Sequence, residues 1–161
     1  MAKLQGNKKI GIVVTVVIVI MWALLIYYLS GQPANQSNRS SFAVTKVIIT
    51  TITKLTNTDF DAKSINRLVF QLNNFVRKLA HISLYFVLGL LAVYAIHKLG
   101  FAARKTYLIA ICLCILYAMT DEWHQTYVPG RSGQISDVLI DTAGTLAGIG
   151  VYVLWLRLRK K

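Results

Sequence analysis

The longest apolar stretch of the sequence, residues 10–29, contains no charge and decides the class of fold. It contains only apolar and small residues apart from one threonine, and two tyrosines stand next to its end. A helix needs about 20 apolar residues to cross a bilayer, and tyrosine is enriched at the membrane interface. A secretory signal peptide is the alternative, because three lysines precede the stretch, but its apolar core spans only about 7–15 residues. We therefore predict a membrane anchor.

The composition supports a membrane protein. Apolar residues make up 55% of the chain and charged residues 15%. Soluble domains average about 45–50% apolar residues and about a quarter charged residues. Three further apolar runs follow the first. The sequence predicts an all-α integral membrane bundle of four transmembrane helices in a single domain, 1–161, with spans at about 10–29, 79–97, 106–125 and 137–156.

The positive charge predicts orientation. A net charge of +12 on a soluble chain would suggest nucleic acid, but here the bases flank apolar runs, so we expect membrane lipids and no nucleic acid as partners. The positive-inside rule places both termini and loop 97–105 in the cytoplasm, and segments 30–78 and 121–137 outside. The bases that decide this are Lys3, Lys8, Lys9, Lys98, Arg104, Lys105, Arg157, Arg159, Lys160 and Lys161.

The outer segment, 30–78, contains two amphipathic stripes. The stronger one runs directly into the second span and predicts a helical extension of it; its members are Ile65, Leu68, Val69, Leu72, Phe75 and Val76. The weaker one is rich in β-branched residues, which are poorer helix formers; its members are Val44, Ile48, Ile52 and Leu55. A helix on the outer leaflet and cover for a neighbouring helix are equally good interpretations of the second stripe.

The third and fourth spans are too short to cross the membrane unless they include acidic residues. The uncharged part of the third, residues 106–120, covers only ~22 Å of a hydrocarbon core roughly 30 Å thick. A third span of full length therefore includes acidic residues at its outer end, and a fourth span of full length does so too. Each such residue costs ~2.5–3.5 kcal/mol by insertion scales, so it should face a protein interior and have a partner. The acids concerned are Asp121, Glu122, Asp137 and Asp141.

Helical spacing brings these acids toward basic and polar residues of the second span. Arg77, His81 and Tyr85 share one face there, with Lys78 beside them, and Asp121 and Gln125 share a face of the third. In the fourth span a GxxxG stripe turns the aspartates toward another helix; it consists of Asp137, Asp141, Gly144 and Gly148. Because neighbouring helical positions point about 100° apart, we expect only one of Asp121 and Glu122 to face the pocket squarely.

The predicted result is one extracytoplasmic pocket in which the four acids meet Arg77, His81, His124 and Arg131. Arg131 follows a Pro-Gly turn signature in the loop 128–133. Arginine suits bidentate recognition of carboxylate or phosphate. A plain salt bridge to Asp121 or Asp137 is the alternative for Arg131.

In order along the chain, these motifs resemble the VanZ-like family of small bacterial membrane proteins. The resemblance covers essentially the whole chain. It rests on Ser30-Gly31-Gln32-Pro33, on Lys78-x-x-His81-x-x-x-Tyr85, on Asp121-Glu122-x-x-Gln125, on Pro129-Gly130-Arg131, and on Asp137 with the following glycines. It implies a bacterial cell-envelope protein, of a family whose founding member is linked to tolerance of the glycopeptide antibiotic teicoplanin. Asp141 is a departure, because we expect asparagine at this place in the family; the additional acid alters the charge balance or binds a proton.

Three functions fit the predicted pocket. The first is recognition of a lipid-linked cell-wall precursor or another anionic head group, in which cations bind phosphate. The second is a membrane-embedded enzyme on such a substrate, with paired acids as general acid and base or as ligands of a divalent cation. The third is a buried polar network that supports an envelope protein partner or a homo-oligomer. No catalytic residue, metal or cofactor is assigned; the candidate binding residues are Arg77, Lys78, His81, Tyr85, Asp121, Glu122, Gln125, Arg131, Asp137 and Asp141.

Overall fold

The computed structural model describes residues 2–58 and 61–159, with side chains from residue 9 onward. The described ranges contain five helices and no strand: α1 (Ala2–Ser30), α2 (Ala34–Leu55), α3 (Ala62–Lys98), α4 (Ala103–Gln125) and α5 (Ile135–Leu158). Four of them are long and apolar enough to cross a membrane, namely α3, α4, α5 and the part of α1 from Lys9 to Ser30. The predicted all-α, multi-pass membrane fold is therefore confirmed.

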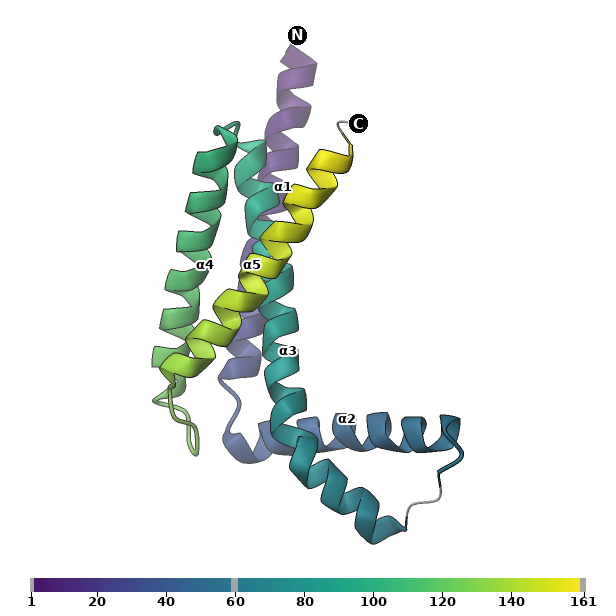
Figure 1. Ribbon diagram of the computed structural model, residues 1–161. Coiled ribbons are helices and arrows are strands. Elements are labelled where there is room, and N and C mark those ends of the chain that lie inside the picture. Colours follow the sequence, from purple (N-terminus) through teal and green to yellow (C-terminus); the bar gives the residue numbers. More distant parts are fainter. Residues whose placement is uncertain (1, 59–60, 160–161) are drawn as a thin grey trace.

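The four spanning helices form a bundle, with α2 lying across one end of it (Figure 1). The beginning of α1, the end of α5 and the α3–α4 connection lie at the opposite end. The α4–α5 loop lies at the same end as α2, which we call the pocket end. The shared end of the two termini follows from an even number of spans; its cytoplasmic location remains a prediction.

The contact between α3 and α5 is set by glycines. A Cβ atom added to Gly144 would lie 2.5 Å from the carbonyl oxygen of Ile82, and one added to Gly89 would lie 2.5 Å from that of Thr145. A Cβ atom added to Gly148 would lie even closer to the carbonyl oxygen of Phe86. Because these neighbours are backbone atoms that cannot rotate away, the two helices approach this closely only where a side chain is absent.

α1 is joined to the bundle by a few directed hydrogen bonds. Trp22 donates from Nε1 to the Leu84 carbonyl at 2.9 Å, and Tyr117 donates from its hydroxyl to the Ala23 carbonyl at 2.6 Å. Most other apolar side chains of α1 are exposed on the bundle surface. These side chains contact lipid in a membrane, where helix association depends on packing and hydrogen bonds rather than on the hydrophobic effect.

α3 continues well beyond the bundle at the pocket end (Figure 1). Asp61 caps its first residue, Ala62, and accepts a hydrogen bond from the Ser64 amide at 3.2 Å. Hydrogen bonding by the side chain and the amide of Ser64 lowers the pKa of the Asp61 carboxyl. The stronger amphipathic stripe is thus part of one continuous helix. α2 packs on this extension through Thr45 and Ile49, which are buried, and through Phe42, whose ring lies 6.3 Å from that of Phe70. The weaker stripe is exposed instead.

Candidate functional site

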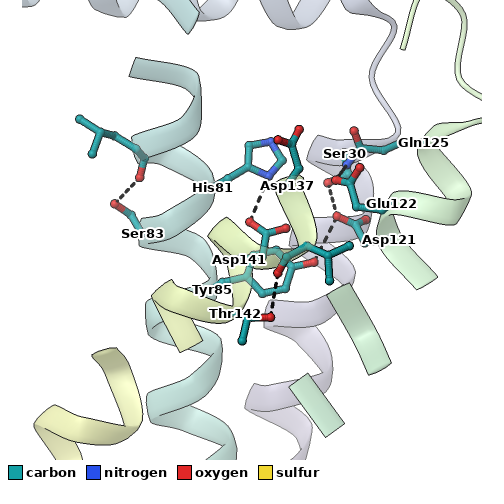
Figure 2. Close-up of polar contacts among 12 residues, drawn as sticks. Ser30, His81, Ser83, Tyr85, Asp121, Glu122, Gln125, Asp137, Asp141 and Thr142 are labelled. Atoms are coloured by element: carbon teal, nitrogen blue, oxygen red, sulfur yellow. Dashed lines mark hydrogen bonds and ion pairs between the residues drawn. The ribbon is translucent and has the colours of Figure 1, made fainter. Parts of the chain in front are cut away.

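Asp121, near the end of α4, joins three helices at the pocket end. Its Oδ2 atom accepts one hydrogen bond from Ser30 of α1 at 2.8 Å and another from the Tyr85 hydroxyl of α3 at 3.2 Å. Figure 2 shows these side chains converging on the carboxylate. Asp121 is 2% exposed and Tyr85 is fully buried. Two donors on one oxygen stabilise an ionised carboxylate, which accepts hydrogen bonds only.

Glu122 is buried beside Asp121 and has its own pair of donors. Gln125 donates to Oε1 at 2.9 Å, and the backbone amide of Gln134 donates to Oε2 at 2.9 Å. Both acids are buried, whereas the sequence led us to expect that only one of them faces the pocket squarely. The reason is that the last turn of α4 is enclosed on two sides: Asp121 points toward α1 and α3, and Glu122 toward the start of α5.

Asp141 completes a group of three carboxylates. It comes from α5 and is fully buried, and one oxygen from each of Asp121, Glu122 and Asp141 lies within 4.8 Å of the others. Nδ1 of His81 lies 3.8 Å from Asp141 Oδ1, which is too far for a hydrogen bond. Within residues 9–58 and 61–159, neither oxygen of Asp141 has a hydrogen-bond partner. We call these three residues the acidic triad; their oxygens are ligands that hard divalent cations prefer.

Arg131 lies on the α4–α5 loop, which folds back over the pocket end. The predicted turn is formed: the Arg131 amide donates to the Val128 carbonyl at 3.0 Å, and Gly130 has a φ of 75°. The loop is anchored on α2, because the Ala34 amide donates to the Pro129 carbonyl at 3.2 Å. The loop therefore holds Arg131 beside α3.

The side chain of Arg131 does not form the salt bridge considered from the sequence. It donates from Nη1 to Gln125 Oε1 at 3.2 Å, and in the described part of the chain no acid lies within 4.0 Å of it. Burial and the positive charge of Arg77 both lower the pKa of the Arg131 guanidinium. Since arginine stays protonated in proteins, two cations lie near each other, and among the described residues neither forms an ion pair within 4.0 Å.

Two cavities adjoin these cations. The smaller, which we call the polar cleft, has a volume of about 20 Å³, enough for a single water molecule or ion. It is lined by Arg77, Lys78, His81, Gln125, Arg131, Asp137, Ile140 and Asp141.

The larger cavity, which we call the groove, has a volume of about 210 Å³ and runs between the end of α1, α2 and α3. Its walls are apolar and serine-rich: Leu29, Ser30, Gln32, Ser37, Ser40, Ser41, Val44, Val76, Ala80 and Leu84. Arg77, His81 and Arg131 line both cavities. The groove thus leads from an apolar wall to the cations.

Seven of the residues selected from the sequence line the polar cleft together: Arg77, Lys78, His81, Gln125, Arg131, Asp137 and Asp141. Tyr85, Asp121 and Glu122 line neither cavity and belong to the buried hydrogen-bonded group described above.

His124 lines neither cavity and is not part of that group. Its ring stacks on Tyr27 with centroids 4.2 Å apart, and it lines a separate cavity beside Gly31. Lys78 is exposed and Asp137 is half-buried at the cleft. The serines of α2 were not selected, although the spacing of Ser37, Ser40 and Ser41 is a helical-face pattern that would have indicated them.

Comparison with known proteins gives one match. A family model described as VanZ/LLP1 matches residues 15–156. That range runs from α1 to α5 and includes the acidic triad and every residue that lines the polar cleft and the groove. No curated protein and no solved structure matches the chain.

Proposed function

The chain belongs to the VanZ/LLP1 family, and we propose that its pocket binds the phosphate-bearing head group of an anionic or lipid-linked cell-envelope molecule at the extracytoplasmic face. One observation carries the proposal: Arg77 and Arg131 come from different elements, line the same two cavities, and have no carboxylate within 4.0 Å among the described residues. Two half-buried cations that repel each other are stabilised by an anion bound between them.

Phosphate fits this arrangement better than a carboxylate of the protein does. A guanidinium binds phosphate through paired hydrogen bonds, and Nε of Arg131 is buried without a partner in the described ranges. Arg131 already uses one nitrogen to reach Gln125, so its orientation is fixed before the ligand arrives. This preorganisation lowers the entropy cost of binding.

The groove supports a lipid rather than a free anion as the ligand. At about 210 Å³ it is smaller than typical pockets for drug-sized ligands, roughly 300–1,000 Å³. It therefore suits a head group and the first part of its chain. The serines of α2 offer hydroxyl groups to the head group, while Val44, Val76 and Leu84 offer an apolar wall to the chain.

The test is native mass spectrometry of the full chain in nanodiscs that contain phosphatidylglycerol and a polyprenyl phosphate. We expect wild type to retain one of these lipids and Arg131→Ala to bind it roughly 10- to 100-fold more weakly, because a hydrogen bond to a charged group contributes about 1.5–3 kcal/mol. Arg104→Ala is the matched control, since it removes an exposed cation at the other end of the bundle. Equal retention by all three proteins would refute the proposal.

Glycopeptide tolerance follows from this proposal as its cellular consequence. Sequestration of a lipid-linked precursor changes how much of it a glycopeptide can reach, without any reaction. We expect expression of wild type to raise growth in teicoplanin, and expression of Arg131→Ala at equal abundance to have no such effect. Loss of abundance in the variant would instead support a structural role for Arg131.

An enzyme acting on a phosphorylated or lipid-linked substrate is the second candidate function. The observation in its favour is that Asp141, a member of the acidic triad, also lines the polar cleft beside the arginines. Carboxylates next to a phosphate site supply general acid–base chemistry. A chemical change in the retained lipid, seen with wild type and lost with Asp121→Asn, would establish this function.

A further inference from the structure

The acidic triad has a property that the head-group proposal does not use: three of its carboxylate oxygens have no protein donor. Asp121 Oδ1, Asp141 Oδ1 and Asp141 Oδ2 are buried, and within the described residues none of them has a hydrogen-bond partner. Buried carboxylate oxygens almost always have a partner, because losing hydration without one costs at least about 1–3 kcal/mol. These oxygens therefore require a positively charged or proton-bearing neighbour.

The protein does not supply enough positive charge to the triad. His81 is the nearest basic residue, at 3.8 Å from one oxygen of Asp141, and among residues 9–58 and 61–159 no lysine or arginine lies within 4.0 Å of an acid. Three acids whose oxygens converge within 4.8 Å repel one another strongly when ionised. A single divalent cation neutralises most of that negative charge.

The donors on the other oxygens favour a metal ion over protons. Asp121 Oδ2 accepts two hydrogen bonds, and each oxygen of Glu122 accepts one. Glu122, with a donor on each oxygen, has the acceptor-only pattern of an ionised carboxylate. These bonds also fix both α4 acids, while Asp121 Oδ1 has no hydrogen-bond partner among the described residues. Figure 2 shows Asp121 and Glu122 of α4 and Asp141 of α5 at the same end of the bundle.

The spacing fits the coordination shell of a hard cation. Calcium–oxygen distances are about 2.3–2.6 Å and magnesium–oxygen distances about 2.0–2.1 Å, so ligands on opposite sides lie roughly 4–5 Å apart. The three carboxylate oxygens of the triad lie within 4.8 Å of one another, which is compatible with that range. The polar cleft next to Asp141 holds about 20 Å³, which accommodates a water molecule as a further ligand.

We propose that Asp121, Glu122 and Asp141 bind a divalent cation of the magnesium, calcium or manganese class. The site lies between α4 and α5, and Asp141 connects it to the polar cleft. The proposal does not depend on the bound lipid, because the ligands are carboxylates and not the arginines.

The experiment titrates Mn²⁺ into the full chain in nanodiscs of neutral phosphatidylcholine and follows free Mn²⁺ by electron paramagnetic resonance. We expect wild type to bind one Mn²⁺ per chain, with displacement by Mg²⁺ or Ca²⁺. Asp141→Asn and Glu122→Gln should each weaken binding by at least about tenfold, as changes around metal ligands commonly do. Asp61→Asn is the control: it removes an exposed carboxylate at the far end of the α3 extension, outside the triad and both cavities, and it should bind like wild type.

Two results would overturn the proposal. One is that wild type binds Mn²⁺ no more tightly than Asp141→Asn. The other is an infrared carbonyl band of a protonated carboxylic acid that persists at saturating Mn²⁺ and disappears in Asp141→Asn, which would show that a proton occupies the triad. Glu122→Gln provides the comparison if Asp141→Asn does not purify as a folded protein. Arg131→Ala should keep Mn²⁺ binding, so this test and the lipid test fail independently.

Discussion

Substitution of Gly148 by alanine should destabilise the bundle, although alanine is the better helix former. A Cβ at this position would lie 3.0 Å from the Phe86 carbonyl carbon, 3.1 Å from the Leu90 nitrogen, and closer still to the Phe86 carbonyl oxygen. Non-bonded heavy atoms prefer separations of about 3.5–4.0 Å. Since the obstructing atoms belong to the α3 backbone, α3 and α5 must separate by several tenths of an ångström or more.

The magnitude follows from a comparison with Gly150→Ala. Both glycines lie in α5, but a Cβ at Gly150 meets no atom within 4 Å. The gain from replacing a helical glycine, about 0.5–1 kcal/mol, is common to both variants. The difference between them is therefore the overpacking cost, about 1–3 kcal/mol. For a chain of this size each kcal/mol shifts Tm by roughly 2–4 °C.

The assay is thermal unfolding of the two purified variants and wild type in the same detergent, followed by intrinsic fluorescence. We expect Gly148→Ala to unfold roughly 2–12 °C below Gly150→Ala, and Gly150→Ala to unfold at or above wild type. If Gly148→Ala were as stable as Gly150→Ala, the α3–α5 contact would not be as close as described, and the argument that glycines set it would fail.

Two further predictions concern the site and the orientation. Ser30→Ala and Tyr85→Phe each remove one donor from the same Asp121 oxygen, and each should lower the free energy of unfolding, measured by chemical denaturation, by about 1–3 kcal/mol. In the double variant the loss should differ from the sum of the two single losses by at least about 0.5 kcal/mol. Strict additivity would contradict a shared acceptor. In a chain with both native cysteines replaced by serine, Ser132→Cys should react with an impermeant maleimide from outside intact cells and Ala102→Cys only after permeabilisation, and the reverse pattern would contradict the predicted topology.

The number and class of the helices follow from sequence because they depend on local composition. Length and hydropathy are properties of each segment alone, and a spanning helix must satisfy its own backbone hydrogen bonds. The continuity of α3 was also predictable, since the apolar stripe that starts at Ile65 keeps helical spacing into the span. Which face of α2 packs was not predictable: Thr45 and Ile49 are buried while Ile48 is exposed, and the choice depends on where α3 lies.

The location of the acids at one end was likewise predictable, but their partners were not. Asp121 is paired with Ser30, which is 91 positions away in the chain, and no periodicity relates the two. His124 was expected in the pocket together with the acids at the end of the third span, yet its ring stacks on Tyr27. Spacing defines a face of one helix, whereas partners depend on how the helices are rotated against each other.

The close approach of α3 and α5 connects the fold to the site. Asp141 lies one turn from Gly144, and Gly144 faces the Ile82 carbonyl next to His81. Because Gly144 has no side chain, the neighbouring turn of α5 lies against α3. Asp141 therefore lies 3.8 Å from His81 and close to the acids of α4. A larger residue at Gly144 would move Asp141 away from its neighbours even if the bundle stayed intact. The glycine stripe thus places the Asp141 carboxylate inside the bundle, where it does not contact lipid.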